Sequence, residues 1–584
     1  QGVWEAELSG DQHGVYYTVQ TMVNGEWQEE TPDPYAKAVG TNGRRACILD
    51  FSKTNPEGWS EDQKPELAGK NDIILYELHV RDLSIHPKSG IEHEGKFLGL
   101  TETGTKGPEG VKTGLDHIKS LGVTHVHLLP SFDYASINEA KLDSPAFNWG
   151  YDPVNYNVPE GSYSTDPSNA ATRIREFKQL VKTLHDNGLR VVMDVVYNHT
   201  FSGTESPLNR TVPGYYYRHT ENGGLSNASG CGNETASERA MMRKFMVESL
   251  KHWVEEYHID GFRFDLMAIH DIETMNQISE ELHAIEPSIF LYGEGWTAGG
   301  SPLPEEQQAL KKHTQRLDRI AAFSDDLRDG VKGSWNDIKS KGFATGNPSA
   351  EQREKVKFGI VGNIAHPQID HSLTPYLPEP WAGEPTKSIN YVACHDNHTL
   401  WDRIAESNEG ENSEAQRLDM HLLANTIVFT SQGVPFLHAG AEFLRTKGGE
   451  ENSYNKPDAV NQLDWERKAE YREVVDFYQK LIALRKNHPA FRMPSKEMIQ
   501  KHLKFEDTDN SHLIAYSLTD NANGDAWEEI RVFFNGGEES TSMAVPSADW
   551  KVVLKGNQID ESGLEGFKGG SLKVPAYSAV ILGR

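Results

Sequence analysis

The sequence predicts an α/β protein built on a (β/α)₈ barrel, with a smaller β-rich region on each side of it. From Ile73 onward, short apolar runs alternate with long amphipathic helices, as in a parallel sheet with crossover helices. Seven such runs are clear and an eighth is expected, which favours a closed barrel. The 584 residues also exceed one ordinary core, so more than one domain is expected.

The N-terminal residues have the pattern of short strands. Val15–Val19 and Ala46–Asp50 alternate between apolar and polar residues and are separated by Gly and Pro turns. We expect residues 1–52 to be the C-terminal part of a β-sandwich whose beginning is missing. A connector rich in Pro, Gly and charged residues follows at 53–72 and is predicted to be a linker.

The barrel is predicted to occupy residues 73–487. Its expected strands are the apolar runs at 73–79, 123–129, 189–196, 259–266, 289–294, 389–394 and 434–438. The sixth strand is expected somewhere between residues 320 and 362, where no run stands out.

Two helices of the barrel have clear apolar stripes. One is predicted over about 236–257, with Thr235 and Glu238 as its capping box. The other is predicted over about 170–185, with Gly188 placed to end it.

After a helix near 471–487, alternating strands return at 530–534 and 550–554. They predict a C-terminal antiparallel β domain over residues 488–584.

Composition excludes several kinds of partner. The formal charge of -28 would repel phosphate backbones, so nucleic acid is not expected as a partner, whereas a neutral substrate fits. No run approaches the roughly 20 apolar residues of a membrane helix, so membrane insertion is not expected. Three distant cysteines indicate neither a zinc site nor a disulfide framework. The chain starts at Gln1 with no leader pattern, so the compartment stays open, as does the oligomeric state.

Polar clusters end four of the predicted strands. They are Asp194–His199, Arg263 with Asp265, Glu294, and His395 with Asp396. A single carboxylate at a strand end is more often an ion-pair partner or a helix cap. Four clusters at one rim of a parallel barrel instead favour an active site, because the carboxyl ends of all strands meet there.

These four segments resemble, in order, the four signature regions of the α-amylase superfamily. The stretch Phe147–Pro153, Phe-Asn-Trp-Gly-Tyr-Asp-Pro, further resembles the motif of type I pullulanases, in which the first residue is Tyr. The resemblance covers nearly the whole chain. It implies a retaining glycoside hydrolase that cleaves α-1,6 branch linkages in pullulan and limit dextrins.

The resemblance also implies catalytic roles. Asp265 corresponds to the nucleophile, Glu294 to the general acid/base and Asp396 to the third carboxylate, which stabilises the transition state. Retention requires the first two carboxyl groups to lie roughly 5 Å apart. Arg263 precedes the nucleophile by two residues on the same strand face and is expected to keep it ionised. An ion pair of Arg263 with Asp152 or Asp194 is the alternative role, and the two roles are compatible.

The remaining matched positions are predicted to bind substrate. His199 and His395 would hydrogen-bond the reacting glucose, and Tyr151 would stack on it. Trp296 is either a second stacking platform or barrel packing. Substrate binding is also expected of Asp152 in the pullulanase-like motif and of Asn452 and Tyr454 in the loop Glu451–Asp458. For this loop, packing against the rest of the protein is an equally good interpretation. No cofactor is required. Asn198 matches a position that binds Ca²⁺ in many relatives, so a structural Ca²⁺ is an option.

Three alternatives remain. An inactive glucan-binding relative would lack catalytic carboxylates, and all three are present here. An α-1,4 amylase, a neopullulanase or a branching transferase would use the same machinery with another cleft. A barrel that works through metal-bound carboxylates is the third.

Overall fold

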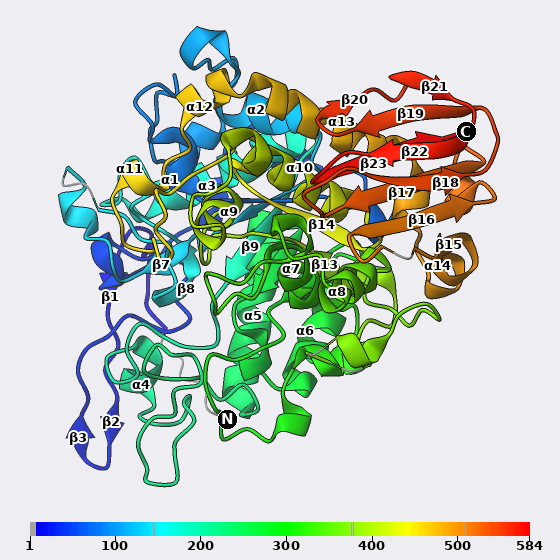
Figure 1. Ribbon diagram of the computed structural model, residues 1–584. Helices are drawn as coiled ribbons and strands as arrows, with labels where there is room; N and C mark the ends of the chain where they lie inside the picture. The colour runs from blue at the N-terminus through cyan, green and yellow to red at the C-terminus, as the bar shows by residue number, and fades with distance from the viewer. Residues whose placement is uncertain (1–6, 144–145, 375, 378, 509) are drawn as a thin grey trace.

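The computed structural model describes residues 7–143, 146–374, 376–377, 379–508 and 510–584. Its centre is a closed barrel of eight parallel strands, which confirms the predicted fold class (Figure 1). Around the barrel the strands follow chain order: β5 (Leu75–Leu78), β6 (His125–Leu128), β9 (Arg190–Val195), β10 (Gly261–Phe264), β11 (Phe290–Gly293), β12 (Ile320–Phe323), β13 (Ser388–Asn390) and β14 (Val434–His438).

Strand β12 is the sixth barrel strand, which the sequence pattern left unplaced. It pairs in parallel with β11 and with β13. Strand β13 ends at Asn390, earlier than the predicted run 389–394. The Asn390 side chain donates to the backbone carbonyls of Gly359 in α8 (Ala350–Ile360) and of Gln432. These two hydrogen bonds fix the chain at the point where it leaves the sheet.

Apolar side chains fill the interior of the barrel below its carboxyl rim. Their alternation along each strand places one set inside the barrel and the other against the surrounding helices. The interior cluster is Ile73, Leu75, Val192, Phe290, Tyr292, Ala321, Phe323, Ile389, Tyr391, Val434 and Phe436.

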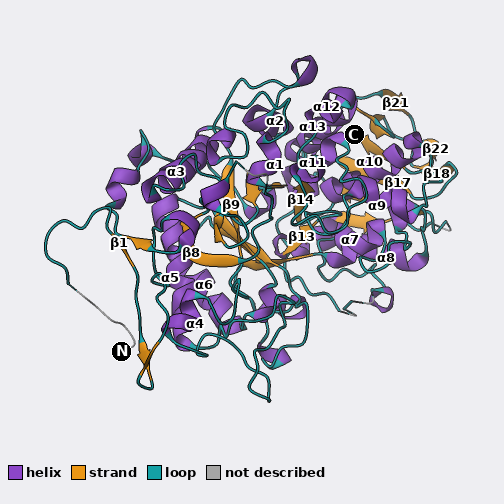
Figure 2. Cartoon of the chain, turned by 90° about the vertical axis from the view of Figure 1, so that its left-hand side faces the viewer, coloured by secondary structure: helices purple, strands orange, loops and turns teal. Residues whose placement is uncertain are grey.

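Helices surround the barrel strands (Figure 2). The helices of the described residues are α1 (Val80–Ser84), α2 (Gly114–Leu121), α3 (Ala170–Asp186), α4 (Pro207–Thr211), α5 (Ala240–Tyr257), α6 (Ile272–Ile285), α7 (Asp325–Lys332), α8 (Ala350–Ile360), α9 (Leu400–Ser407), α10 (Glu414–Thr430), α11 (Asp458–Asn461), α12 (Trp465–Glu470), α13 (Arg472–Asn487) and α14 (Lys496–His502), the last of which packs on the C-terminal strands. No helix in these described segments is both long enough and apolar enough to cross a membrane.

The predicted capping box of α5 is wrong. The helix starts at Ala240 after Arg239, without a side-chain cap. Thr235 instead donates its hydroxyl to the Tyr197 carbonyl at 2.6 Å, and Glu238 pairs with Arg218 at 2.7 Å. Thr235 therefore ties the start of the helix to the segment after β9, and Glu238 ties it to the loop that holds Arg218, rather than capping the helix.

The described N-terminal residues contain two small antiparallel pairs. Strand β1 (Tyr16–Tyr17) pairs with β4 (Ala46–Cys47), and β2 (Met22–Val23) pairs with β3 (Glu26–Trp27) in a hairpin that projects from the body (Figure 1). The assignment of 1–52 to a β-sandwich stays a prediction, and residues 1–6 lie outside the described part.

The C-terminal region is antiparallel, as predicted. Its strands are β15 (Leu503–Phe505), β16 (Leu513–Thr519), β17 (Glu529–Asn535), β18 (Thr541–Val545), β19 (Trp550–Lys555), β20 (Gln558–Ile559), β21 (Glu565–Phe567), β22 (Gly570–Val574) and β23 (Ser578–Gly583). The last of these, β23, lies between β17 and β19. A separate antiparallel pair is formed by β7 (Phe132–Tyr134) and β8 (Pro153–Pro159). The exact domain boundaries stay predictions.

Trp253 joins α5 to the rest of the fold and provides a test of this packing. It is fully buried, and its indole nitrogen donates to the Tyr156 carbonyl at 2.9 Å. Trp253→Ala should lower the free energy of unfolding by about 3 to 5 kcal/mol, measured by urea denaturation, because it leaves a cavity and an unpaired carbonyl. The control Trp27→Ala removes a side chain that is 62% exposed and should change it by about 0.5 kcal/mol or less. Equal losses would contradict this packing role.

Candidate active site

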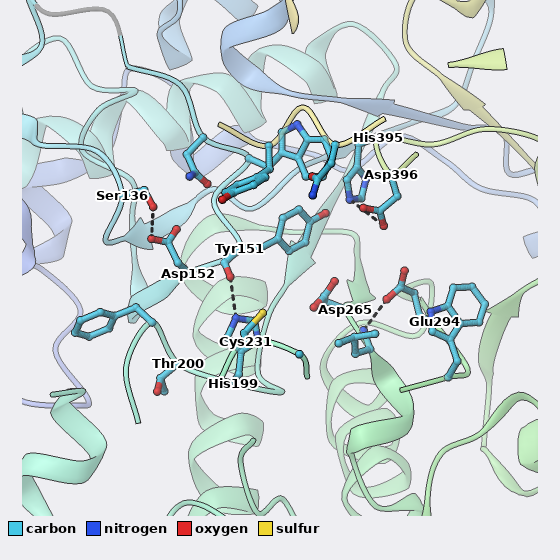
Figure 3. A pocket seen from close by; sticks show the side chains of 18 residues that line it. Ser136, Tyr151, Asp152, His199, Thr200, Cys231, Asp265, Glu294, His395 and Asp396 are labelled. Atoms are coloured by element: carbon cyan, nitrogen blue, oxygen red, sulfur yellow. Dashed lines mark hydrogen bonds and ion pairs between the residues drawn. The ribbon is translucent and has the colours of Figure 1, made fainter. Parts of the chain in front are cut away.

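A cavity of about 590 Å³ opens at the carboxyl ends of the barrel strands (Figure 3). It brings together residues that lie far apart in the sequence. Ten of the eleven predicted catalytic and substrate-binding residues line it: Tyr151, Asp152, His199, Asp265, Glu294, Trp296, His395, Asp396, Asn452 and Tyr454. The eleventh, Arg263, lies directly beneath it.

Arg263 is the cation at the base of the cavity. Its side chain is 3% exposed, and Nη1 lies 2.9 Å from Asp194 Oδ1 and 2.9 Å from Asp265 Oδ1. Its Nη2 lies 2.8 Å from Glu294 Oε1. One guanidinium thus binds carboxylates from three neighbouring strands, and it orients both proposed reacting groups. Of the two alternative partners considered for Arg263, the structure selects Asp194.

Asp265 follows β10 and faces the cavity. Besides Arg263, it accepts a hydrogen bond from Asn198 Nδ2 at 2.7 Å. Burial raises the pKa of Asp265 above its ordinary value, while the Arg263 charge opposes that shift. The two donors favour the ionised carboxylate, which is the form that a nucleophile requires.

Glu294 follows β11 and lies opposite Asp265 across the cavity (Figure 3). Its Oε2 accepts a hydrogen bond from the Leu266 backbone at 2.8 Å. Burial, with the negative charges of Asp265 and Asp396, raises the pKa of Glu294 to about 8 against the opposing charge of Arg263. Glu294 therefore keeps its proton at neutral pH, as a general acid must.

Tyr151 and His395 form a stacked pair in the cavity wall. Their ring centroids are 5.1 Å apart with an interplanar angle of 17°. The Tyr151 hydroxyl donates to Asp194 Oδ2 at 2.6 Å, which fixes the ring. His395 Nε2 lies 3.6 Å from Asp396 Oδ2, and the Asp396 side chain is 49% exposed. A sugar in the cavity can therefore reach both an aromatic face and a carboxylate.

His199 lines the cavity, and its predicted hydrogen bond to the reacting glucose stays a prediction. Its Nε2 lies 2.8 Å from the Tyr151 carbonyl oxygen (Figure 3), and its Nδ1 lies 2.5 Å from Asn198 Oδ1. Both ring nitrogens thus face protein oxygens, and the ring ties β9 to the Phe147–Pro153 segment.

Asn198 holds its neighbours in place. Its amide nitrogen donates to the Asp265 backbone and side chain, and its amide oxygen lies 2.5 Å from His199 Nδ1. A structural Ca²⁺ at this position stays a prediction.

Asp152 and Trp296 both line the cavity. Asp152 accepts a hydrogen bond from Ser136 Oγ at 2.5 Å, and burial raises its pKa to about 6. Trp296 is half-buried, with its ring centroid 6.5 Å from that of Phe323 in the barrel interior. It therefore contacts both the cavity and the barrel core, and its role as a stacking platform stays a prediction.

The loop after β14 reaches the cavity beside the Phe147–Pro153 segment. The Trp149 backbone nitrogen donates to the Tyr454 carbonyl at 3.0 Å, and the Tyr454 side chain is 44% exposed. Behind them the Lys447 ammonium lies 5.2 Å from the centre of the Trp149 ring. The two segments form one wall of the cleft, with Asn452 exposed at its edge.

Sequence reasoning missed several cavity residues. Trp149 was inside a quoted motif and could have been selected as an aromatic platform. Ser136, Phe201 and the exposed Cys231 lie in loops without periodicity, and no pattern identifies them. Glu77, which contacts His395, is the next-to-last residue of the first barrel strand. A carboxylate at that strand end was the available signal.

Comparison with known proteins agrees with this geometry. The family description "Alpha amylase, catalytic domain" matches residues 51–211, and "Pullulanase, all-beta domain" matches residues 499–558. The barrel and its carboxylate site define a glycoside hydrolase of the α-amylase superfamily.

Longer matches identify the family within this class. A pullulanase of Bacillus subtilis is 44% identical over 94% of this chain and 73% of its own length. A crystal structure of a Paenibacillus barengoltzii pullulanase with maltohexaose and α-cyclodextrin shares 50% identity and a TM-score of 0.92, over 99% of this chain and 87% of that one. A maltotriose complex of an Anoxybacillus pullulanase shares 42% identity and a TM-score of 0.89, over 98% and 78%. The chain belongs to the pullulanase family.

The protonation of Glu294 predicts the pH profile. Glu294 must hold a proton to act as an acid, so kcat/KM should fall as the pH rises through about 8. It should also fall at low pH, where Asp265 gains a proton. Initial rates on pullulan between about pH 4 and about pH 10 test both limbs. An alkaline midpoint near the ordinary glutamate value of about 4.3 would contradict the assignment.

Proposed function

We propose that this chain hydrolyses α-1,6 branch linkages in pullulan, amylopectin-derived limit dextrins and related α-glucans, with retention of configuration. In the first half-reaction, Asp265 attacks the anomeric carbon while Glu294 protonates the departing oxygen. The bond to the leaving sugar breaks and a covalent glycosyl-enzyme forms. Tyr151 stacks on the reacting glucose, and Asp396 and His395 bind its hydroxyl groups.

In the second half-reaction, Glu294 changes from acid to base. It is now ionised and takes a proton from water, which attacks the same anomeric carbon and releases Asp265. Arg263 serves both halves, because it contacts Asp265 through Oδ1 and Glu294 through Oε1 and so keeps the two groups oriented throughout the cycle. The return of the proton to Glu294 completes the cycle. No step requires a metal ion.

The choice of the α-1,6 bond is carried by one observation, the contact between the Trp149 backbone and the Tyr454 carbonyl. It joins the two segments that resemble debranching enzymes into one cleft wall next to the reacting groups. An α-1,6 bond adds a rotatable carbon between the two rings, so the leaving chain approaches from another direction than in an α-1,4 chain. A wall that stabilises that approach in the transition state selects the linkage.

The roles of the two carboxyl groups predict distinct mutant behaviour. Asp265→Ala and Glu294→Gln should each fold and lose activity by at least ~100-fold to ~10⁴-fold. Added azide should restore cleavage to Asp265→Ala, because a small anion can occupy the vacated space and attack the same carbon. Near-normal turnover with unchanged melting would refute the roles, and azide rescue of Glu294→Ala alone would exchange them.

The linkage prediction is tested by the products from pullulan, in which two α-1,4 bonds alternate with one α-1,6 bond. Maltotriose should be the sole limit product, and the viscosity of linear amylose should hardly change. Size separation of the digest identifies the bond that is cut. Panose would place the chain with the neopullulanases, and rapid loss of amylose viscosity with the α-1,4 amylases.

A further inference from the structure

Glu77 is a buried carboxylate at the mouth of the barrel that the proposed reaction leaves without a role. It lies on β5, and its side chain is 1% exposed. In the barrel register it is next to His127 on β6 and His438 on β14. Burying an ionised carboxylate costs free energy unless hydrogen bonds or opposite charges compensate it. The group that pairs with Glu77 therefore indicates what Glu77 does.

That partner is His395, which Glu77 contacts with both carboxylate oxygens. Oε1 lies 2.6 Å from His395 Nδ1, and Oε2 accepts a hydrogen bond from the His395 backbone nitrogen at 2.7 Å. The bidentate contact fixes the main chain and the ring plane together. The ring is further confined by the stack on Tyr151 and by the edge contact with Trp149, at a centroid distance of 4.9 Å. His395 therefore has one orientation.

The two sides of the His395 ring face acidic groups. Nδ1 must carry a hydrogen to bond Glu77, and Nε2 points toward Asp396 Oδ2 at 3.6 Å. A neutral ring with its hydrogen on Nδ1 would offer only a lone pair on the cavity side, opposite the oxygens of Asp396. A second proton converts Nε2 into a donor, which can bind Asp396 or a sugar hydroxyl.

We propose that Glu77 is a positioning residue that fixes His395 in one orientation and keeps it as an imidazolium, so that Nε2 always donates toward the reacting glucose. The inference rests on the function proposed above and adds to it. It assigns to a residue outside the cavity the control of one hydrogen bond inside it. Glu77 itself does not touch the substrate.

The surrounding charges are consistent with a protonated ring. Burial and Arg263 oppose the charge on His395. Burial and Arg445 lower the pKa of the neighbouring His438 well below its ordinary value, so that ring is neutral, and the Lys447 ammonium interacts with Glu77 and Asp396. The carboxylates Asp396, Glu77 and Asp194 favour the charge on His395, and His127 Nε2 lies 3.3 Å from Asp194 Oδ2. The contacts with Asp396 and Glu77 prevail over burial and raise the pKa of His395 to about 9.

The test variant is Glu77→Gln, which keeps the shape and removes the charge. One amide oxygen cannot accept from both His395 nitrogens, and the pKa of His395 should return toward its ordinary value of about 6.5. Pullulan hydrolysis should fall by at least about 10-fold at pH 8 and by no more than about 3-fold at pH 6, each relative to wild type. A loss that is the same at both pH values would overturn the proposal.

A double-mutant cycle separates this role from a general field effect on Glu294. If Glu77 acts through His395, then Glu77→Gln should have no further effect on kcat in a His395→Ala background. If the two losses multiply, Glu77 acts elsewhere and the proposal fails.

If Glu77→Gln does not fold, the variant Glu77→Asp tests the proposal instead. It withdraws the carboxylate by one methylene and should give a smaller loss of activity with the same pH dependence. A wild-type profile in Glu77→Asp would then refute it.

The chain offers a matched control in Glu442. This carboxylate is fully buried and lies 2.6 Å from His117 Nε2, away from the residues that line the cavity. Glu442→Gln breaks a Glu–His pair of the same kind, so it should lower the melting temperature without changing the pH dependence of kcat.

A wild-type enzyme that leaves pullulan intact would refute the proposed function. A wild-type enzyme that cleaves pullulan, beside a Glu77→Gln variant with the same profile, would refute the role of Glu77 alone.

Discussion

The rim of the barrel concentrates more negative charge than its cations can balance, and the site depends on how that charge is held. Four largely buried carboxyl groups, Glu77, Asp194, Asp265 and Glu294, and the half-exposed Asp396 lie around the buried guanidinium of Arg263 and the imidazoles of His127 and His395. Burial makes full ionisation of the four buried groups unfavourable. Protons therefore remain where the balance requires them, on Glu294 and on His395. The acid needed for glycoside cleavage thus follows from an excess of charge.

Arg263 orients both reacting carboxyl groups. It contacts Asp194, Asp265 and Glu294 together, and each reacting group has one further donor, Asn198 Nδ2 for Asp265 and the Leu266 backbone nitrogen for Glu294. Burial, with the negative charges of Asp265 and Asp396, keeps the proton on Glu294. Asp194 completes the set, because it binds both Arg263 and the Tyr151 hydroxyl and so links the electrostatics of the base to the aromatic wall.

The barrel and most of the site could be predicted because both depend on local patterns. An apolar strand followed by Asp, Glu or His can be recognised in the sequence. Parallel topology then brings the ends of all these strands to one rim of the barrel. Strand β12 was not readable because its four residues, Ile-Ala-Ala-Phe, contain two alanines and have no flanking contrast. The capping box at Thr235 failed for a related reason: the spacing was right, but the hydroxyl was already bonded to the Tyr197 carbonyl. Tertiary contacts that compete for a polar group cannot be read from its neighbours in the sequence.

The cleft wall depends on such contacts throughout. Trp149 and Tyr454 are separated by some three hundred residues, yet a backbone hydrogen bond joins them, and the buried Lys447 lies behind the indole ring. His79 holds the same segment from below, with its Nε2 3.1 Å from the Asn148 carbonyl. The reacting groups sit on rigid strand ends that many barrels of this class can share, but this wall is assembled from loops whose positions are set by packing against one another. Chemistry and linkage choice are therefore separable in this fold: changes in the wall can redirect which bond is presented, while the charge balance around Arg263 stays intact.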